Sequence, residues 1–287
     1  MIFLFKSIGI VPRLDSDDAL KLAIKICRYL KSRKIDTFPE IEFAKNNRIG
    51  QGVSLSQMEV DLIITIGGDG TVLKTSMNIP KPETPILAIN MGRRGYLTEV
   101  EPNQALTALE ECLQGKYDLE EHSKLSVYFK NKHIAEGVNE ALLTPATSWK
   151  MLNFVIKQNK HKLIEQRADG LIIATPTGST AHSFSAGGPI LETSLDAFVV
   201  VFISPVDYMR SLVLSSTDDL SIKLTDTNMG ALLTVDGRYT KQIAPEESII
   251  IRKSKNRAVF VRLNSSFWSR SLNRHKLGPR EDDSVYS

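Results

Sequence analysis

The sequence predicts an α/β amino-terminal domain with a mainly parallel sheet, followed by a β-rich carboxy-terminal domain. Two observations lead to this fold class. Over residues 1–122, short apolar runs typical of buried strands alternate with helix-like stretches, as expected where helices cover a parallel sheet. From residue 123 to about 270, the pattern changes to short alternating or β-branched runs separated by turn residues. Residues 271–287 are polar and aperiodic, so we expect a flexible tail there.

The elements of the first domain follow from the spacing of apolar residues. Strands are expected at residues 8–11, 62–66 and 86–89, which are short apolar runs rich in isoleucine. A helix is expected after Asp15, which offers a cap and is followed by an acidic first turn. Its apolar face comprises Ala19, Leu22, Ala23, Ile26 and Leu30. Further helices are expected at residues 71–77 and 104–113, which places a loop at positions 67–70.

The second domain is expected to consist largely of strands. The runs that predict them are residues 125–129, 154–157, 199–203, 221–224, 248–251 and 259–263. Turn residues occur at 130–132, 226–228 and 244–246.

Composition and charge exclude several classes of protein. The 36 basic and 33 acidic side chains are spread along the chain and form no dense basic stripe, so we expect no nucleic-acid partner. The first residues are too short an apolar stretch for a signal peptide, and we expect a cytoplasmic protein. Residues 171–191 carry no Lys, Arg, Asp or Glu but are rich in Gly, Pro, Ser and Thr, so they do not predict a membrane span. Cys27 and Cys112 are expected to be buried, reduced thiols.

The first motif that indicates chemistry is Gly67-Gly68-Asp69-Gly70-Thr71. It leaves a buried strand and enters a helix, at the sheet edge where α/β proteins bind ligands. Glycines there permit positive φ and close approach of a phosphate, and the helix start supplies N–H groups. An ordinary turn is the alternative. The chain has neither GxxxxGK[ST] nor GxGxxG, which disfavours P-loop and common dinucleotide-binding folds.

Three further segments carry polar groups among apolar runs. Residues 169–189 form a strand followed by a loop dense in hydroxyls and glycines, which suits sugar, adenine and phosphate recognition better than a flexible linker. Asn139 and Glu140 interrupt an apolar strand, where either a ribose or a solvated β-bulge would satisfy them. Residues 235–238, Val-Asp-Gly-Arg, end a strand, and this pattern predicts a hairpin turn. The rigid fork of Arg238 makes it a candidate for phosphate contact.

In order and spacing, these four segments resemble the signature of the NAD kinase family, and the resemblance extends from residue 7 to about 263. GGDG alone would also fit lipid kinases and 6-phosphofructokinases. The resemblance implies an α/β domain and a β-rich domain with the site between them, often completed by a neighbouring subunit. We therefore expect a homodimer or homotetramer.

The resemblance also implies roles for individual residues. Asp69 matches the position that contacts the reacting ribose and is the favoured base. Gly67 and Gly68 match glycines that lie against phosphate, and Gly70 adjoins the NAD site. The other positions that match NAD contacts are Asn139 and Glu140 for the adenosine part, Thr180, Ala181 and Ser185 around the adenine, and Asp169 near the nicotinamide end. His182 is also expected to bind NAD; it stands where many family members have tyrosine, and histidine can still stack or donate a hydrogen bond.

The expected reaction transfers the terminal phosphoryl group of ATP, or of polyphosphate, to the 2′-hydroxyl of the adenosine ribose of NAD. Mg²⁺ or another divalent cation would shield the phosphate charge, and the sequence contains no metal-ligand pattern of its own. Two alternatives stay open. A diacylglycerol-type lipid kinase would need an apolar entry surface, and we find no amphipathic basic helix to provide one. A catalytically silent NAD-binding regulator is disfavoured by the intact Asp69.

Overall fold

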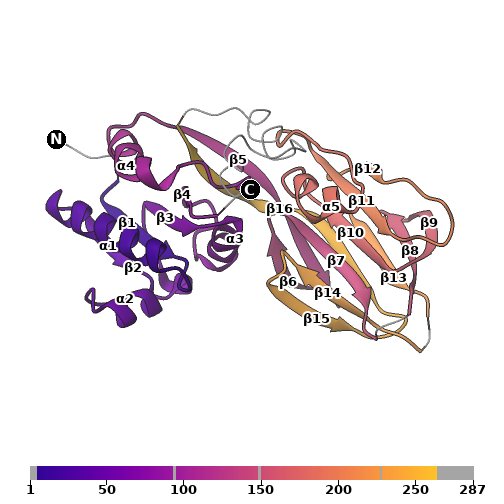
Figure 1. The fold of residues 1–287 in the computed structure, drawn as a ribbon. Coiled ribbons are helices and arrows are strands. Elements are labelled where there is room, and N and C mark those ends of the chain that lie inside the picture. The colour runs from indigo at the N-terminus through magenta and orange to yellow at the C-terminus, as the bar shows by residue number, and fades with distance from the viewer. Residues whose placement is uncertain (1–4, 93–94, 148–149, 227, 264–287) are drawn as a thin grey trace, which may run out of the picture.

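The protein has two domains connected by two long strands (Figure 1). The structure is a computed structural model that describes residues 5–92, 95–147, 150–226 and 228–263. The connecting strands are β5 (Asp118–Phe129) and β16 (Ser248–Arg262), which pair in antiparallel fashion over most of their length. The sequence predicts two separate strands at 248–251 and 259–263, but β16 is continuous. Its register shifts between Lys253 and Arg257, and this irregularity coincides with the break in the apolar pattern.

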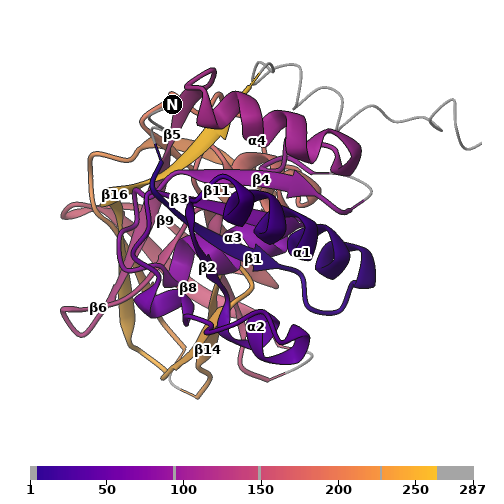
Figure 2. The ribbon, with the colours of Figure 1, turned by 90° about the vertical axis from the view of Figure 1, so that its left-hand side faces the viewer.

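The amino-terminal domain is a parallel sheet with helices on both faces (Figure 2). Its strand order is β2-β1-β3-β4, and β16 continues the sheet beyond β4. The bounds of these elements are β1 (Ser7–Pro12), β2 (Asp36–Pro39), β3 (Leu62–Gly67), β4 (Ile86–Asn90), α1 (Asp17–Ser32), α2 (Ile41–Asn47), α3 (Asp69–Asn78) and α4 (Ala105–Leu113). Side chains of α1 and α4 share one core, and those of α3 belong to the core on the other face. Strand β2 and helix α2 are additions to the predicted elements.

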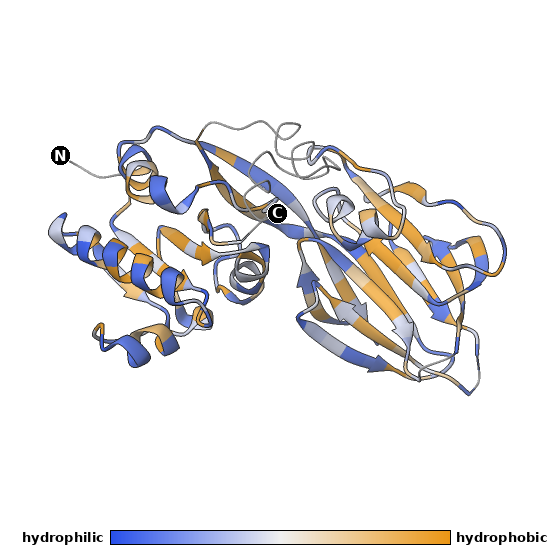
Figure 3. Ribbon diagram, in the orientation of Figure 1, coloured by the Kyte–Doolittle hydropathy of each residue, from blue (hydrophilic) through white to orange (hydrophobic). Residues whose placement is uncertain are grey.

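Helix α1 illustrates how the sequence determines these elements. Ser16, and not Asp15, caps the helix, because the Ser16 side chain accepts a hydrogen bond from the Ala19 N–H. Asp15 instead pairs with Arg13 at 2.6 Å. The inward face is fully buried at Ala23, Ile26 and Leu30, while the outer face is hydrophilic (Figure 3).

The carboxy-terminal domain is a sandwich of antiparallel strands. One layer continues the long sheet and the other is a separate six-stranded sheet of order β12-β11-β10-β7-β14-β15. The large core between the layers contains Leu125, Phe154, Leu171 and Phe198. The bounds are β6 (Lys132–Gly137), β7 (Glu140–Pro145), β8 (Leu152–Gln158), β9 (His161–Ala168), β10 (Gly170–Ala174), α5 (His182–Ser185), β11 (Ala197–Ile203), β12 (Leu212–Ser215), β13 (Leu220–Leu224), β14 (Ala231–Val235) and β15 (Tyr239–Ile243).

The two-domain fold class is thus confirmed, whereas the boundary near residue 122 stays a prediction. That boundary falls inside β5, a strand that extends from one domain into the other. The predicted turn at 130–132 is confirmed, since Lys130 and Asn131 have positive φ between β5 and β6. The predicted tail at 271–287 lies outside the described residues.

Candidate functional site

The GGDG segment forms a very short connection between β3 and α3. Gly67 ends the strand and Asp69 begins the helix, so the loop is shorter than the predicted 67–70. The expected positive φ is wrong, because the positive-φ glycines of the described chain are Gly50, Gly115, Gly187 and Gly237. Gly67 is required for a different reason: a Cβ there would lie 2.2 Å from the Thr71 hydroxyl oxygen. A Cβ at Gly68 would meet nothing within 4 Å, so that face of the loop is open to a ligand.

The carboxylate of Asp69 is held in one orientation by the loop that follows β4. Its Oδ1 accepts N–H groups of Tyr96 at 3.1 Å and Leu97 at 3.0 Å, and its Oδ2 lies 3.0 Å from the Tyr96 nitrogen. Thr98 adds a longer contact of 3.4 Å. Asp69 therefore anchors residues 96–98 to the start of α3, a role that the sequence did not reveal. Its predicted role as a base stays a prediction.

The turn at residues 138–140 is organised by a second carboxylate, that of Asp236. Its Oδ2 accepts the Val138 N–H at 2.7 Å, and its Oδ1 accepts those of Asn139 at 2.8 Å and Glu140 at 3.0 Å. The Asp236 N–H donates in return to the Glu140 carbonyl at 3.0 Å. The Asp236 side chain is buried, and the predicted hairpin turn is confirmed, with positive φ at both Asp236 and Gly237.

Glu140 carries a buried carboxyl whose pKa is strongly raised. Only 9% of the residue is exposed, and its Oε2 accepts no hydrogen bond from the residues that the structure describes. Burial, and secondarily the negative charge of Asp236, raise the pKa of Glu140 to about 8. The alternative interpretation of this segment, a β-bulge whose side chains are solvated, does not fit because Glu140 is buried. A buried acceptor without a donor fits a ligand hydroxyl group.

The loop after β10 packs directly on the same turn. The Thr175 hydroxyl donates to the Val138 carbonyl at 2.5 Å, and the Thr175 N–H donates to the Asn139 carbonyl at 2.8 Å. Gly178 touches Asn139 so closely that a Cβ would lie 2.0 Å from the Asn139 carbonyl oxygen. The hydroxyls that make this loop unusual bond mainly to the protein itself, as for Ser179 and Thr180 with carbonyls three residues earlier.

The GGDG loop joins the other motifs through Arg238. Its Nη2 donates to the Gly70 carbonyl at 2.8 Å, across 168 residues of sequence. Arg238 follows the turn that carries Asp236, so the two residues connect the helix start of α3 with the turn 138–140. The structure thus brings all four sequence motifs into contact. The phosphate contact predicted for Arg238 stays a prediction.

A buried polar chain that the sequence did not predict runs behind the site. The His122 Nδ1 lies 2.8 Å from the Thr177 hydroxyl, and its Nε2 lies 3.3 Å from Glu120. Glu120 pairs with Arg262, which donates to the Leu97 carbonyl at 3.1 Å. Although burial opposes it, the contacts with His122 and Arg262 hold the pKa of Glu120 well below its usual range. The chain therefore links the loop after β10 with the loop held by Asp69.

The remaining predicted contacts lie at different distances from this centre. Thr180 is buried, whereas His182 and Ser185 are exposed on α5 and Ala181 precedes them. Asp169 precedes β10 and Thr175 follows it, so about 20 Å of strand separates them. Within one chain, Asp169 is thus placed away from the turn 138–140. The ligand roles of these residues stay predictions.

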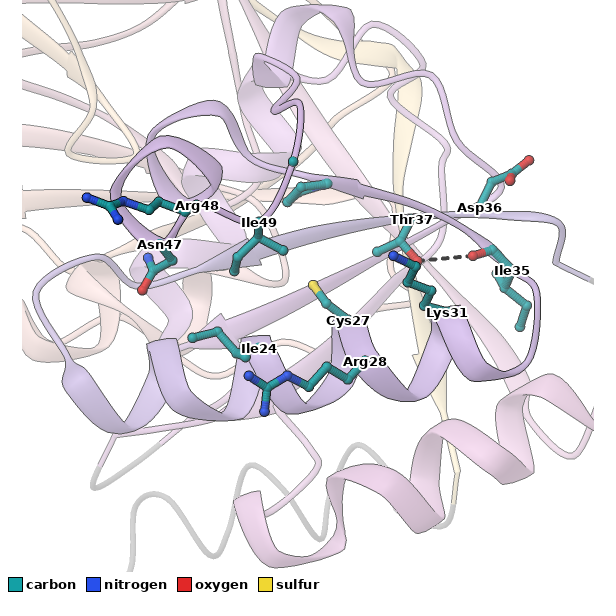
Figure 4. A pocket seen from close by; sticks show the side chains of 12 residues that line it. Ile24, Cys27, Arg28, Lys31, Ile35, Asp36, Thr37, Asn47, Arg48 and Ile49 are labelled. Carbon is teal, nitrogen blue, oxygen red and sulfur yellow. Dashed lines mark hydrogen bonds between the residues drawn. The ribbon is translucent and has the colours of Figure 1, made fainter.

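The described part of the chain also contains a separate pocket of about 650 Å³ at the outer edge of the first domain (Figure 4). Isoleucines of α1 and of the segments after α1 and α2 line it, together with Arg28, Lys31 and Arg48. Cys27 lies there, and burial raises the pKa of its thiol to about 11. Burial likewise raises the pKa of Cys112 to about 12, which agrees with the predicted inert, reduced thiols.

In the part of the chain that the structure describes, no group of three or more His, Cys, Asp or Glu side chains is arranged to hold a metal ion. None of the helices there is both long enough and apolar enough to cross a membrane.

Comparisons with known proteins converge on one family. Residues 8–117 match the family model described as the ATP-NAD kinase N-terminal domain, and residues 138–263 match that of the C-terminal domain. An NAD kinase of Methanothermobacter thermautotrophicus is 39% identical over 91% of this chain and 93% of its own length. One from Thermococcus gammatolerans is 36% identical over 91% of this chain and 96% of its own length.

Solved structures show the same fold. A yeast NADH kinase in complex with NADH superposes with a TM-score of 0.87, at 21% identity, over 96% of this chain and 89% of the other. An NAD kinase from Archaeoglobus fulgidus in complex with ATP gives a TM-score of 0.72, at 24% identity, over 93% of this chain and 96% of the other.

Proposed function

The chain belongs to the ATP-NAD kinase family, and we propose that its reaction takes place where the GGDG loop, the turn 138–140 and the loop after β10 meet. The activity is that of an NAD kinase: the terminal phosphoryl group of ATP passes to the 2′-hydroxyl of the adenosine ribose of NAD. This location is supported by hydrogen bonds that connect all four motifs. Arg238 bonds to Gly70, Asp236 to residues 138–140, and Thr175 to Asn139.

The proposed acceptor site uses the buried carboxyl of Glu140. Ribose hydroxyls are hydrogen-bond donors, and the Glu140 Oε2 is a buried acceptor without a described donor. Asn139 beside it would bind the adenosine part of NAD. Thr180, Ala181, His182 and Ser185 would lie around the adenine, and Asp169 near the nicotinamide. Since Asp169 is about 20 Å of strand away from Thr175, we propose that a neighbouring subunit brings it to the site.

The proposed donor site is the loop at the start of α3. Gly67 and Gly68 would lie against phosphate, Gly70 beside NAD, and the first N–H groups of the helix favour an anion. Asp69 is the candidate base for the 2′-hydroxyl, and Arg238 a candidate phosphate contact. Mg²⁺ or another divalent cation would arrive with ATP, because Mg²⁺ is usually bound by substrate phosphates and only one or two carboxylates. The chemistry it would supply is shielding of phosphate charge.

We propose a cytoplasmic homodimer or homotetramer, with no membrane or nucleic-acid partner. The even spread of basic and acidic side chains supports the absence of a nucleic-acid partner. ATP is the proposed phosphoryl donor, and inorganic polyphosphate is the alternative donor to be compared with it.

The two alternatives receive no support from the comparisons, which give NAD kinases. One assay separates all three functions. The protein is incubated with ATP, Mg²⁺ and NAD, and NADP is detected with an NADP-specific dehydrogenase; a parallel reaction contains diacylglycerol vesicles. NADP formation is expected. Phosphorylation of diacylglycerol without NADP would indicate a lipid kinase, and NAD binding without turnover would indicate a silent regulator.

A further inference from the structure

The hairpin turn between β14 and β15 makes two long-range contacts that its local role does not require. Asp-Gly is already a favourable pair for a turn with two positive φ values, so the sequence alone explains these residues as turn formers. Yet the Asp236 carboxylate is buried and accepts three backbone N–H groups that lie 96–98 residues earlier. Two residues later, Arg238 contacts Gly70.

Asp236 fixes the half of the site that carries Asn139 and Glu140. Three donors on one carboxylate constrain the backbone of residues 138–140, because charge-assisted hydrogen bonds are among the strongest in proteins. Gly137 allows the approach, since a Cβ there would lie 2.9 Å from Asp236 Oδ1. The Asp236 carboxylate accepts hydrogen bonds from the protein backbone. Its role is therefore to position residues 138–140 rather than to contact a ligand.

Arg238 fixes the half of the site that carries the GGDG loop. Its guanidinium donates to the carbonyl of Gly70, the second residue of α3. A Cβ at Gly70 would lie 2.8 Å from Arg238 Nη2, so glycine is needed for this contact. Gly70 adjoins Asp69, and therefore the position of the GGDG loop depends on the same short turn that holds residues 138–140.

We propose that the β14–β15 turn is a positioning element that sets the distance between the phosphoryl-donor half and the ribose-acceptor half of the site. Asp236 acts through the turn 138–140, and Arg238 acts through Gly70. The proposal rests on the proposed function, since it concerns the alignment of that same site. Alignment to well within 1 Å is what phosphoryl transfer requires, because misplacement of that size costs about 10²-fold in rate.

The test for Asp236 uses Asp236→Asn, because Asn-Gly is as good a turn former as Asp-Gly. The amide cannot accept hydrogen bonds on both of its terminal atoms, so one side of the turn 138–140 loses its support. NAD affinity, measured by titration calorimetry without ATP, should fall about 10-fold or more. Glu246→Gln is the matched control: Glu246 is an exposed acid with φ 60 in the β15–β16 turn, and its loss of charge should leave affinity unchanged.

The test for Arg238 separates positioning from phosphate binding. In Arg238→Met, a positioning role predicts that kcat falls about 10²-fold while ATP affinity stays within about threefold of the parent. Arg238→Lys, which keeps a donor near Gly70, should recover part of the loss in kcat. A large loss of ATP affinity with normal kcat would overturn the positioning role of Arg238. Unchanged NAD affinity in Asp236→Asn would overturn that of Asp236.

The Asp236 outcome can be distinguished from a failure of the proposed function. Calorimetry reports NAD binding whether or not the parent protein forms NADP. If the parent forms no NADP, the proposed function fails on its own assay, and the loss of NAD affinity in Asp236→Asn still tests the positioning of residues 138–140.

Discussion

Replacing Glu140 by glutamine should stabilise the protein without ligand while weakening NAD binding. The Glu140 carboxyl is buried, and its pKa rises from an ordinary 4.5 to about 8. Below pH 4.5, both the folded and the unfolded chain hold the proton; between there and pH 8, only the folded chain keeps it. Stability therefore falls as the pH rises toward 8 and then levels off.

The size of this effect follows from the pKa. Each tenfold change in proton affinity corresponds to about 1.4 kcal/mol, so at pH 8 the buried acid lowers the free energy of unfolding by on the order of 4 kcal/mol. Glutamine has nearly the same shape and never ionises. For a chain of this size, the melting temperature of Glu140→Gln at pH 8 should exceed that of the parent by on the order of 10 °C. At pH 5 the difference should shrink to about a fifth of that value.

Differential scanning calorimetry at pH 5 and pH 8 measures this directly, with Glu246→Gln as an exposed control that should not shift. NAD titration at pH 8, where the Glu140 carboxyl of the parent ionises, should show about 10- to 150-fold weaker binding, the loss of a charge-assisted hydrogen bond of about 1.5–3 kcal/mol. A melting temperature gap that is equal at both pH values, or unchanged NAD binding at pH 8, would show that Glu140 is not the buried, NAD-binding carboxyl described above.

Three further predictions concern Asp69, two glycines of the site loops and the oligomeric state. In Asp69→Asn, single-turnover phosphorylation should slow by about 10²–10⁴-fold if Asp69 is the base; turnover within a few-fold of the parent, in a variant with parental thermal unfolding, would remove it from the mechanism. Gly178→Ala should lose about 1–3 kcal/mol of stability, because its Cβ would meet the Asn139 carbonyl. Gly68→Ala should fold normally, because its Cβ would meet no protein atom, but it should lose ATP affinity. Equal stability of the two variants would contradict this packing argument. Light scattering should give at least a dimer, and a fully active monomer would contradict a site shared between subunits.

Residue pattern alone could predict the strands and helices whose periodicity is regular. The buried runs of β1, β3 and β4 and the inward face of α1 are examples, because their side chains face one environment along the whole element. Pattern failed for β16, which crosses from one domain to the other, so its side chains face several environments and its apolar pattern breaks in the middle. Strand β2 has only four residues, too few for a periodic signal.

For the site, sequence identified the motifs but not the contacts among them. The sequence predicts only a turn for Asp236, because Asp-Gly is a common turn pair. No neighbouring residue indicates that its carboxylate accepts three N–H groups from a segment almost 100 residues away. His122 reads as a lone histidine, and only the fold brings it to the Thr177 hydroxyl. Such roles arise from tertiary structure, so a single sequence carries no local signal for them.

The proposed NAD kinase reaction is tested most directly by following the terminal phosphoryl group of ATP to the 2′-position of NAD on this protein. ATP labelled at the terminal phosphate is incubated with NAD, Mg²⁺ and a stoichiometric amount of enzyme, and the products are separated and quantified. We predict that the label appears in NADP, one for each ADP formed, and that chelation of Mg²⁺ abolishes the transfer. Label found only as inorganic phosphate, or retained in ATP while NAD binds, would contradict the assignment of this site.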